Sequence, residues 1–191
     1  MRDSRRINSL MYHDLVEDKN TSASGFEGAA ADRYKQTPEN FESHLDAIEQ
    51  RCVRSAKAVD VDTALSASPE ATPWLATFDD GGVSAIDAAA RLQQHDSIGH
   101  FFVTTSRIGT KGFLSEQQIR SLREAGHVVG SHSHTHPAPI SALSDDELQS
   151  EWQQSVSILA EILGQPVTVA SVPGGFYSRR VALAAEAAGI R

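Results

Sequence analysis

Short apolar runs alternate with segments of helical periodicity along most of this chain. Each run is followed by polar or glycine-rich residues that can form a turn, as expected for buried strands. The runs fall at residues 10–12, 74–78, 99–104, 127–131 and 167–172. Strands that alternate with helices are typical of a parallel sheet in an α/β protein. The pattern therefore predicts an α/β fold whose strands end at one common edge of the sheet.

Capping signals mark the helical segments in addition to their periodicity. Ser115 with Gln118, and Ser144 with Glu147, both fit the capping box, in which each side chain binds the other residue's backbone N–H. The apolar stripe after Ser144 ends at Gly164, a residue type that often stops a helix. We expect helices at residues 37–52, 84–92, 115–126, 144–164 and 179–188.

Two stretches show neither periodicity. Residues 17–37 are polar and rich in glycine, alanine and serine, so we expect a long loop that shapes a substrate cleft. Residues 60–72 are expected to be irregular.

Composition indicates a single globular domain over residues 1–191. The net charge of -8 and the lack of a basic stripe argue against nucleic-acid binding. The only cysteine, Cys52, excludes an internal disulfide and a thiolate metal cage, and its alignment with Phe41 and Leu45 predicts a small buried residue. Neither a signal-peptide pattern nor an apolar segment of membrane-spanning length is present, so a cytoplasmic location is the default expectation. The oligomeric state is left open.

Two short runs carry the candidate chemistry. Thr77-Phe78-Asp79-Asp80-Gly81 ends one apolar run with adjacent carboxylates, and the run at 131–137 offers imidazoles at His132 and His136. One aspartate and two histidines form the ligand set of an open catalytic metal site, which leaves the second aspartate as a base for water. An Asp-Asp-Gly sequence alone is usually only a turn. Because both runs follow predicted parallel strands, we expect them to meet in one site.

The remaining histidines are less informative. His134 lies between the two candidate ligands and either points away from them or joins a different ligand arrangement. His13 ends the first predicted strand and could face the same cavity. We expect the others to be surface or half-buried residues without a role in the site; they are His44, His95, His100 and His127.

These motifs resemble the polysaccharide deacetylase family, also called the NodB-homology domain or carbohydrate esterase family four. Residues 77–81 resemble its first motif, and His132-Ser133-His134-Thr135-His136 resembles its second. Tyr12-His13, the Pro-Glu-x-Phe helix start at 38–41 and residues 99–103 are also similar. The resemblance implies a deformed (β/α) barrel of about seven strands.

The resemblance also implies residue roles. Asp80, His132 and His136 would bind a divalent metal, most commonly zinc, which acidifies water and polarises an acyl carbonyl. Asp79 would be the general base, and the backbone N–H of Gly174 would stabilise the oxyanion. The implied activity is the removal of N-acetyl groups from an amino sugar or polysaccharide.

Two departures from the family pattern stand out. Ser171-Val172-Pro173-Gly174-Gly175 occupies the third motif, where the family has an arginine that orients the base, so the chain resembles a variant branch. The later motifs, including the histidine that acts as general acid, are missing, so we expect a C-terminally truncated barrel with about five of seven strands. His134 or His13 could replace that acid. The alternatives are a catalytically silent carbohydrate-binding or remnant domain, or a hydrolase of a non-sugar amide.

Overall fold

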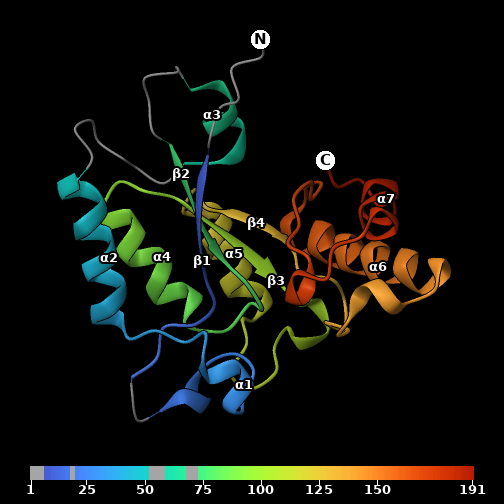
Figure 1. Ribbon diagram of the computed structural model, residues 1–191, viewed down its shortest axis with the longest axis horizontal. Coiled ribbons are helices and arrows are strands. Elements are labelled where there is room, and N and C mark those ends of the chain that lie inside the picture. Colours follow the sequence, from blue (N-terminus) through green and yellow to red (C-terminus); the bar gives the residue numbers. More distant parts are fainter. Residues whose placement is uncertain (1–6, 18–19, 52–58, 68–72) are drawn as a thin grey trace.

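The computed structural model describes residues 7–17, 20–51, 59–67 and 73–191. Its centre is a four-stranded sheet in the order β1-β2-β3-β4, in which every neighbouring pair is parallel (Figure 1). The expected α/β class is therefore confirmed. The strands are β1 (Asn8–Tyr12), β2 (Trp74–Phe78), β3 (Gly99–Val103) and β4 (Val128–Ser131).

Helices connect consecutive strands and continue beyond the sheet. In Figure 1, α2 and α4 lie side by side, while α6 and α7 form a separate pair beyond β4. None of the helices in the described ranges combines the length and apolar character needed to cross a membrane. The helices are α1 (Ala29–Asp32), α2 (Pro38–Arg51), α3 (Val61–Ser66), α4 (Ala85–Gln94), α5 (Glu116–Glu124), α6 (Asp145–Leu163) and α7 (Arg179–Ala187).

An aromatic layer forms the core beneath the sheet. Phe78 of β2 stacks on Tyr12 at a ring-centroid distance of 5.3 Å and on Phe101 at 4.9 Å. The Phe41 ring of α2 meets Phe78 edge-on and is fully buried. Helix α2 packs onto the ends of β1 and β2 through this layer, where the parallel pairing of the two strands places Tyr12 beside Phe78.

Both expected capping boxes are present. The Ser115 and Ser144 hydroxyls accept from the backbone N–H groups of Gln118 and Glu147, whose side chains accept from the cap residues in return. Helix α6 ends at Gly164 in the left-handed conformation, with φ of 65°. These local signals were sufficient to fix the starts of α5 and α6.

The expected fifth strand at residues 167–172 is wrong. This segment makes one isolated bridge to β4, between Ser131 and Ala170, so the described residues form four strands and not five. Two backbone hydrogen bonds join the segment to Ser131, at 2.9 and 3.0 Å. Both bonds use the backbone of Ser131, and among the described residues no further backbone hydrogen bond between this segment and β4 extends them into a ladder.

Other expectations also need correction. The stretch expected to be irregular contains α3, because the Asp60 side chain caps its N-terminus by accepting from the N–H of Thr63. Residues 17–37 contain a short 3₁₀ helix, Thr21–Ala23, as well as α1. His100 and His127 are fully buried and not surface residues. Cys52 lies outside the described residues.

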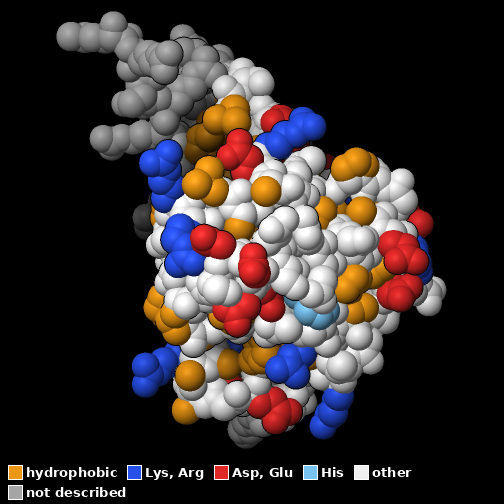
Figure 2. All heavy atoms as spheres, turned by 90° about the vertical axis from the view of Figure 1, so that its right-hand side faces the viewer, with side chains coloured by type: hydrophobic (Ala, Val, Ile, Leu, Met, Phe, Trp, Pro, Cys, Tyr) orange, Lys and Arg blue, Asp and Glu red, His pale blue; other side chains and the backbone are white. Residues whose placement is uncertain are grey.

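Charged groups are dispersed on the face that carries α6 and α7. In Figure 2 the Lys and Arg side chains lie apart from one another, with acidic groups between them. The coloured side chains of that face therefore form no continuous basic stripe.

Candidate metal centre

The carboxyl ends of three strands bring the candidate residues together. Asp79 and Asp80 follow β2, His132 follows β4, and His13 follows β1. Backbone hydrogen bonds fix these exits, from Asp79 N to the Tyr12 oxygen at 3.0 Å and from His132 N to the Val103 oxygen at 3.0 Å. Because parallel strands share one carboxyl edge, residues that are distant in sequence converge at this point.

Local backbone conformations at the site are unusual. Asp80, Ser133 and His136 all have positive φ, at 74°, 62° and 60°. Such conformations are uncommon for residues other than glycine and occur frequently at functional sites. A hydrogen bond from the His136 N–H to the Ser133 hydroxyl, at 3.1 Å, stabilises the turn that returns His136 to the site.

Asp80, His132 and His136 form a compact ligand set. Oδ1 of Asp80 lies 3.4 Å from Nε2 of His132 and 3.5 Å from Nε2 of His136. Two ligands of one tetrahedral zinc ion, bound at about 2.0–2.1 Å, lie about 3.4 Å apart. The three donor atoms lie within 4.8 Å of one another, so the spacing fits a single divalent ion.

Burial and hydrogen bonds define the state of the ligands. His132 is 1% exposed, and its Nδ1 lies 3.1 Å from the backbone oxygen of Ser171. Since a carbonyl only accepts, Nδ1 carries a proton, which leaves Nε2, facing Asp80, as the nitrogen available to a metal ion. Asp80 is also buried, whereas the His136 side chain is 24% exposed.

The mutual electrostatics of the three ligands agree with this convergence. Burial opposes ionisation of Asp80, but the hydrogen bond and charge of His132 outweigh it and lower the pKa of Asp80. For His132, burial likewise opposes the charged form, and the hydrogen bond to Asp80 with the charges of Asp79 and Asp80 raises its pKa. Burial, and next the neighbouring His132 charge, lowers the pKa of His136.

Asp79 lies beside the ligand set with one oxygen held and one free. Its Oδ2 accepts from the Ser171 hydroxyl at 2.9 Å and lies 4.0 Å from Nε2 of His132. Its Oδ1 is buried and has no hydrogen-bond partner among the described residues. A buried carboxylate oxygen without a partner is suited to accept a proton from water.

A cavity of about 610 Å³ opens in front of these groups. His13 and Gly174 both line it, and a Cβ at Gly174, where φ is 60°, would lie 2.7 Å from the Phe176 ring. His134 is not among the lining residues; its Nδ1 lies 2.9 Å from the Thr105 hydroxyl. The structure therefore brings His13 to the cavity and directs His134 elsewhere.

The segment that we expected to shape a substrate cleft lines this cavity, but its individual lining residues were not identified from the sequence. Phe26, Ala30, Ala31 and Tyr34 line it from the segment expected to be a loop. The clustering of these apolar residues within nine positions was the available signal. The role of Ser171 as partner of Asp79 was also missed, although its position in the third motif pointed to it.

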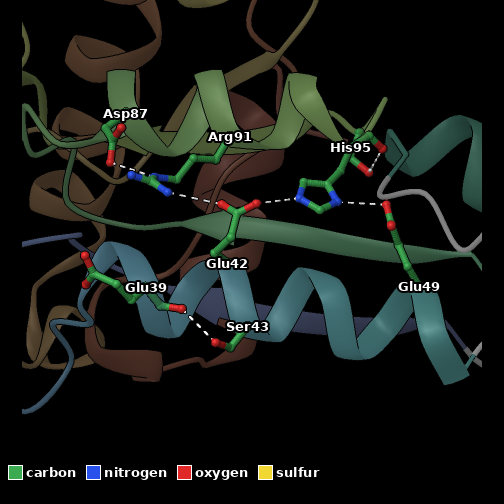
Figure 3. A network of polar contacts seen from close by, with 8 residues as sticks. Glu39, Glu42, Ser43, Glu49, Asp87, Arg91 and His95 are labelled. Atoms are coloured by element: carbon green, nitrogen blue, oxygen red, sulfur yellow. Dashed lines mark hydrogen bonds and ion pairs between the residues drawn. The ribbon is translucent and has the colours of Figure 1, made fainter.

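A second group with metal-ligand chemistry lies between α2 and α4, away from this edge. Glu42, Asp46 and His95 offer ligand atoms close to one another. However, the Glu42 carboxylate is already occupied by His95 at 2.7 Å and by Arg91 at 3.1 Å (Figure 3). A cation there would compete with the Arg91 guanidinium, so this group is an ion-pair network between two helices.

The fold and the site together define a parallel α/β protein with a candidate Asp/His/His centre at the carboxyl edge of its sheet. The family model described as polysaccharide deacetylase matches residues 66–191. This chain therefore belongs to the polysaccharide deacetylase family.

Similar proteins agree with this assignment. YxkH of Bacillus subtilis is 24% identical over 183 residues, which cover 94% of this chain but 61% of YxkH. The Streptococcus pyogenes deacetylase PplD, solved in complex with acetate, superposes with a TM-score of 0.78 at 21% identity, covering 96% of this chain and 80% of PplD. BA3943 of Bacillus anthracis, described as a pseudoenzyme of family CE4, gives a TM-score of 0.52 at 22% identity, covering 60% of this chain and 39% of BA3943. At these identities the solved structures show the shared NodB-type fold.

Proposed function

We propose that this chain is a metal-dependent hydrolase that removes N-acetyl groups from an amino sugar or polysaccharide. The observation that carries the proposal is the convergence of Asp80, His132 and His136 beside Asp79, whose Oδ1 has no hydrogen-bond partner among the described residues. One carboxylate oxygen and two imidazole nitrogens suit Zn²⁺ in an open catalytic site. When bound, such an ion acidifies water and polarises the acyl carbonyl.

The residues of this chain have distinct roles in the proposed reaction. Oδ1 of Asp79 takes the proton of the attacking water, while the Ser171 hydroxyl on Oδ2 holds the carboxylate in its orientation. The backbone N–H of Gly174 is proposed to donate to the oxyanion that develops on the acyl oxygen. The amine then leaves after it receives a proton from a general acid.

His13 is the proposed general acid. It lines the cavity, and its ring stacks on Tyr34 at a centroid distance of 4.8 Å, which fixes its plane. His134, the other candidate, is engaged with Thr105 outside the cavity. Replacing His13 with Ala should lower kcat by about a hundredfold, the usual scale of general acid catalysis, while His134→Ala should leave kcat nearly unchanged. Equal turnover in wild type and His13→Ala would exclude this role.

Metal analysis combined with acetate release tests the main proposal. Purified wild-type protein should contain about one divalent ion per chain, and His132→Ala or Asp80→Asn should lose it. Asp79→Asn should retain the ion but release no acetate from N-acetylglucosamine oligomers. Metal content that survives both ligand substitutions contradicts the proposed centre.

A second candidate is a carbohydrate-binding protein without catalytic activity. The neutral Ser171 beside Asp79, in place of the family's arginine, favours it, and BA3943 shows that a protein with this fold is described as a pseudoenzyme. Glycan binding that is unchanged in Asp79→Asn, without acetate release from wild type, would support this candidate. Release of acetate or formate only from small non-sugar amides would instead indicate a hydrolase with a different substrate.

A further inference from the structure

A buried lysine holds the segment Thr21–Phe26 over the edge of the sheet. The Lys35 ammonium donates to the carbonyl oxygens of Phe26 at 2.7 Å, Ser24 at 2.9 Å and Thr21. The Lys35 side chain is only 3% exposed, and its nearest carboxylate oxygen belongs to Asp32 at 3.6 Å. Because an ammonium has three donors, this arrangement closes the segment into a loop around one charge.

A second anchor fixes the same segment to the end of β1. Oδ1 of Asp14 accepts from the hydroxyls of Ser24 at 2.6 Å and Ser84 at 2.9 Å. Gly25 packs against this carboxylate so closely that a Cβ there would lie 1.9 Å from Oδ2. Its N–H also donates to the Gly112 oxygen at 2.9 Å. The segment is thus a fixed wall of the site, with its last residue, Phe26, at a defined position.

Phe26 connects this anchored segment to the candidate metal centre, because its ring contacts the ring of His136. Its ring centroid lies 5.0 Å from that of the ligand His136 and 5.1 Å from that of Phe113. The Arg107 guanidinium carbon lies 5.2 Å from the Phe26 centroid, so the ring contacts neighbours besides His136. Phe26 also lines the cavity, which makes it both a wall of the pocket and a support for His136, the most exposed of the three ligands.

We propose that Lys35 is a positioning residue of the metal centre and acts through Phe26; this inference rests on the proposed function of that centre. Without the ammonium, three carbonyl oxygens lose their hydrogen-bond donor and turn toward water. The segment then no longer holds the Phe26 ring in contact with His136. His136 then gains rotational freedom and contact with water. Loss of such outer contacts typically weakens metal binding by about 10–100-fold.

Zinc affinity is the measurement that reports on this role. Competition with a chromophoric chelator gives the dissociation constant for wild type, Lys35→Met, Phe26→Ala and the double variant. Each single substitution should weaken zinc binding about tenfold. The double variant should bind no more weakly than the weaker single variant, because both changes remove the same contact. In parallel, the KM for an N-acetylglucosamine oligomer should rise in each variant, since the cavity loses a wall.

Two further variants serve as controls. Lys111→Met removes an exposed lysine from a neighbouring loop and should leave zinc affinity unchanged. Lys35→Gln retains a donor for part of the carbonyl set, so it should fall between wild type and Lys35→Met, and it provides a second reading if Lys35→Met does not fold.

The outcomes separate this inference from the proposed function. Failure of wild-type protein to bind zinc overturns the function and this inference together. Wild-type zinc binding with unchanged affinity in the Lys35 variants and in Phe26→Ala overturns this inference alone. A lower melting temperature in Lys35→Met without a change in zinc affinity assigns Lys35 to fold stability and overturns the inference. Multiplied losses in the double variant mean that Lys35 does not act through Phe26, and this result also overturns the inference.

Discussion

The side chain that contacts the Asp79 carboxylate is a neutral hydroxyl. The Ser171 Oγ donates to Oδ2 at 2.9 Å, while the backbone oxygen of Ser171 lies 3.1 Å from Nδ1 of His132. One residue therefore contacts the proposed base through its side chain and a proposed metal ligand through its backbone. A neutral hydrogen bond is weaker than a charge-assisted one but still restricts rotation of the carboxylate.

Ser171→Ala should separate these two contacts. Loss of the hydroxyl frees the Asp79 carboxylate to rotate, so kcat for acetate release should fall about tenfold, equivalent to about 1.4 kcal/mol. Zinc content should remain at the wild-type value, because the contact with His132 uses the backbone. Ser171→Thr, which retains the hydroxyl, should recover most of the rate. Full activity in Ser171→Ala would mean that other contacts orient the base.

The convergence of candidate residues was predictable where the sequence signals are local. Asp79 and Asp80 are adjacent and follow an apolar run, and His132 follows another, so strand ends alone predicted their convergence. The contribution of Lys35 was not predictable in this way. Its three carbonyl partners carry no side-chain signal, and the burial of its ammonium depends on a loop conformation that the pattern does not specify.

At the scale of elements, a charged network joins α2 to α4. His95 binds Glu42 through Nε2 at 2.7 Å and Glu49 through Nδ1 at 2.8 Å (Figure 3). Ionised carboxylates only accept, so both ring nitrogens carry protons and the imidazole is charged. The hydrogen bond to Glu42, and next the one to Glu49, raises the pKa of His95 despite partial burial.

The stability contributed by His95 should therefore depend on pH. A pKa raised in the folded state gives stabilisation that is complete below the unfolded value of about 6.5 and lost as pH rises through the folded value. His95→Gln should lower the melting temperature by about 2 °C at pH 5.5, the scale of a partly exposed ion pair of less than about 1 kcal/mol. At pH 9 the two proteins should melt together. Thermal unfolding at both pH values tests this, and a pH-independent difference contradicts it.

Element prediction succeeded at the capping boxes of α5 and α6, missed α3 despite its local Asp60 cap, and failed at residues 167–172. The capping boxes of α5 and α6 are formed as expected from four residues each. Residues 167–172 were correctly read as apolar, and Val167 is buried, but a strand requires a neighbour with which to pair. Only one bridge forms, at Ser131, although residues 128–130 of β4 precede that residue. Whether a neighbouring strand completes the ladder is not encoded in the segment itself.

At the scale of the whole molecule, α6 joins two hydrophobic clusters. Leu148 and Trp152 pack with Val181 of α7, whereas Leu159 and Ile162 belong to the cluster beneath the sheet. The apolar stripe predicted most of these residues as core, but periodicity could not divide the stripe between two partners. This division places the first half of α6 against α7 and leaves its second half to support β4, from which His132 emerges.

Because the candidate ligands follow β2 and β4, zinc binding should stabilise the whole fold. An ion that binds only the folded state adds about 2.7 kcal/mol at a free concentration 100 times its dissociation constant, which raises the melting temperature of a domain of this size by about 5–10 °C. Asp79→Asn should show the same increase, since Asp79 is not a proposed ligand, whereas Asp80→Asn should show almost none. Mg²⁺ at equal concentration should have little effect, because it prefers an all-oxygen octahedral shell. An equal rise in Asp80→Asn would mean that zinc binds elsewhere on the protein.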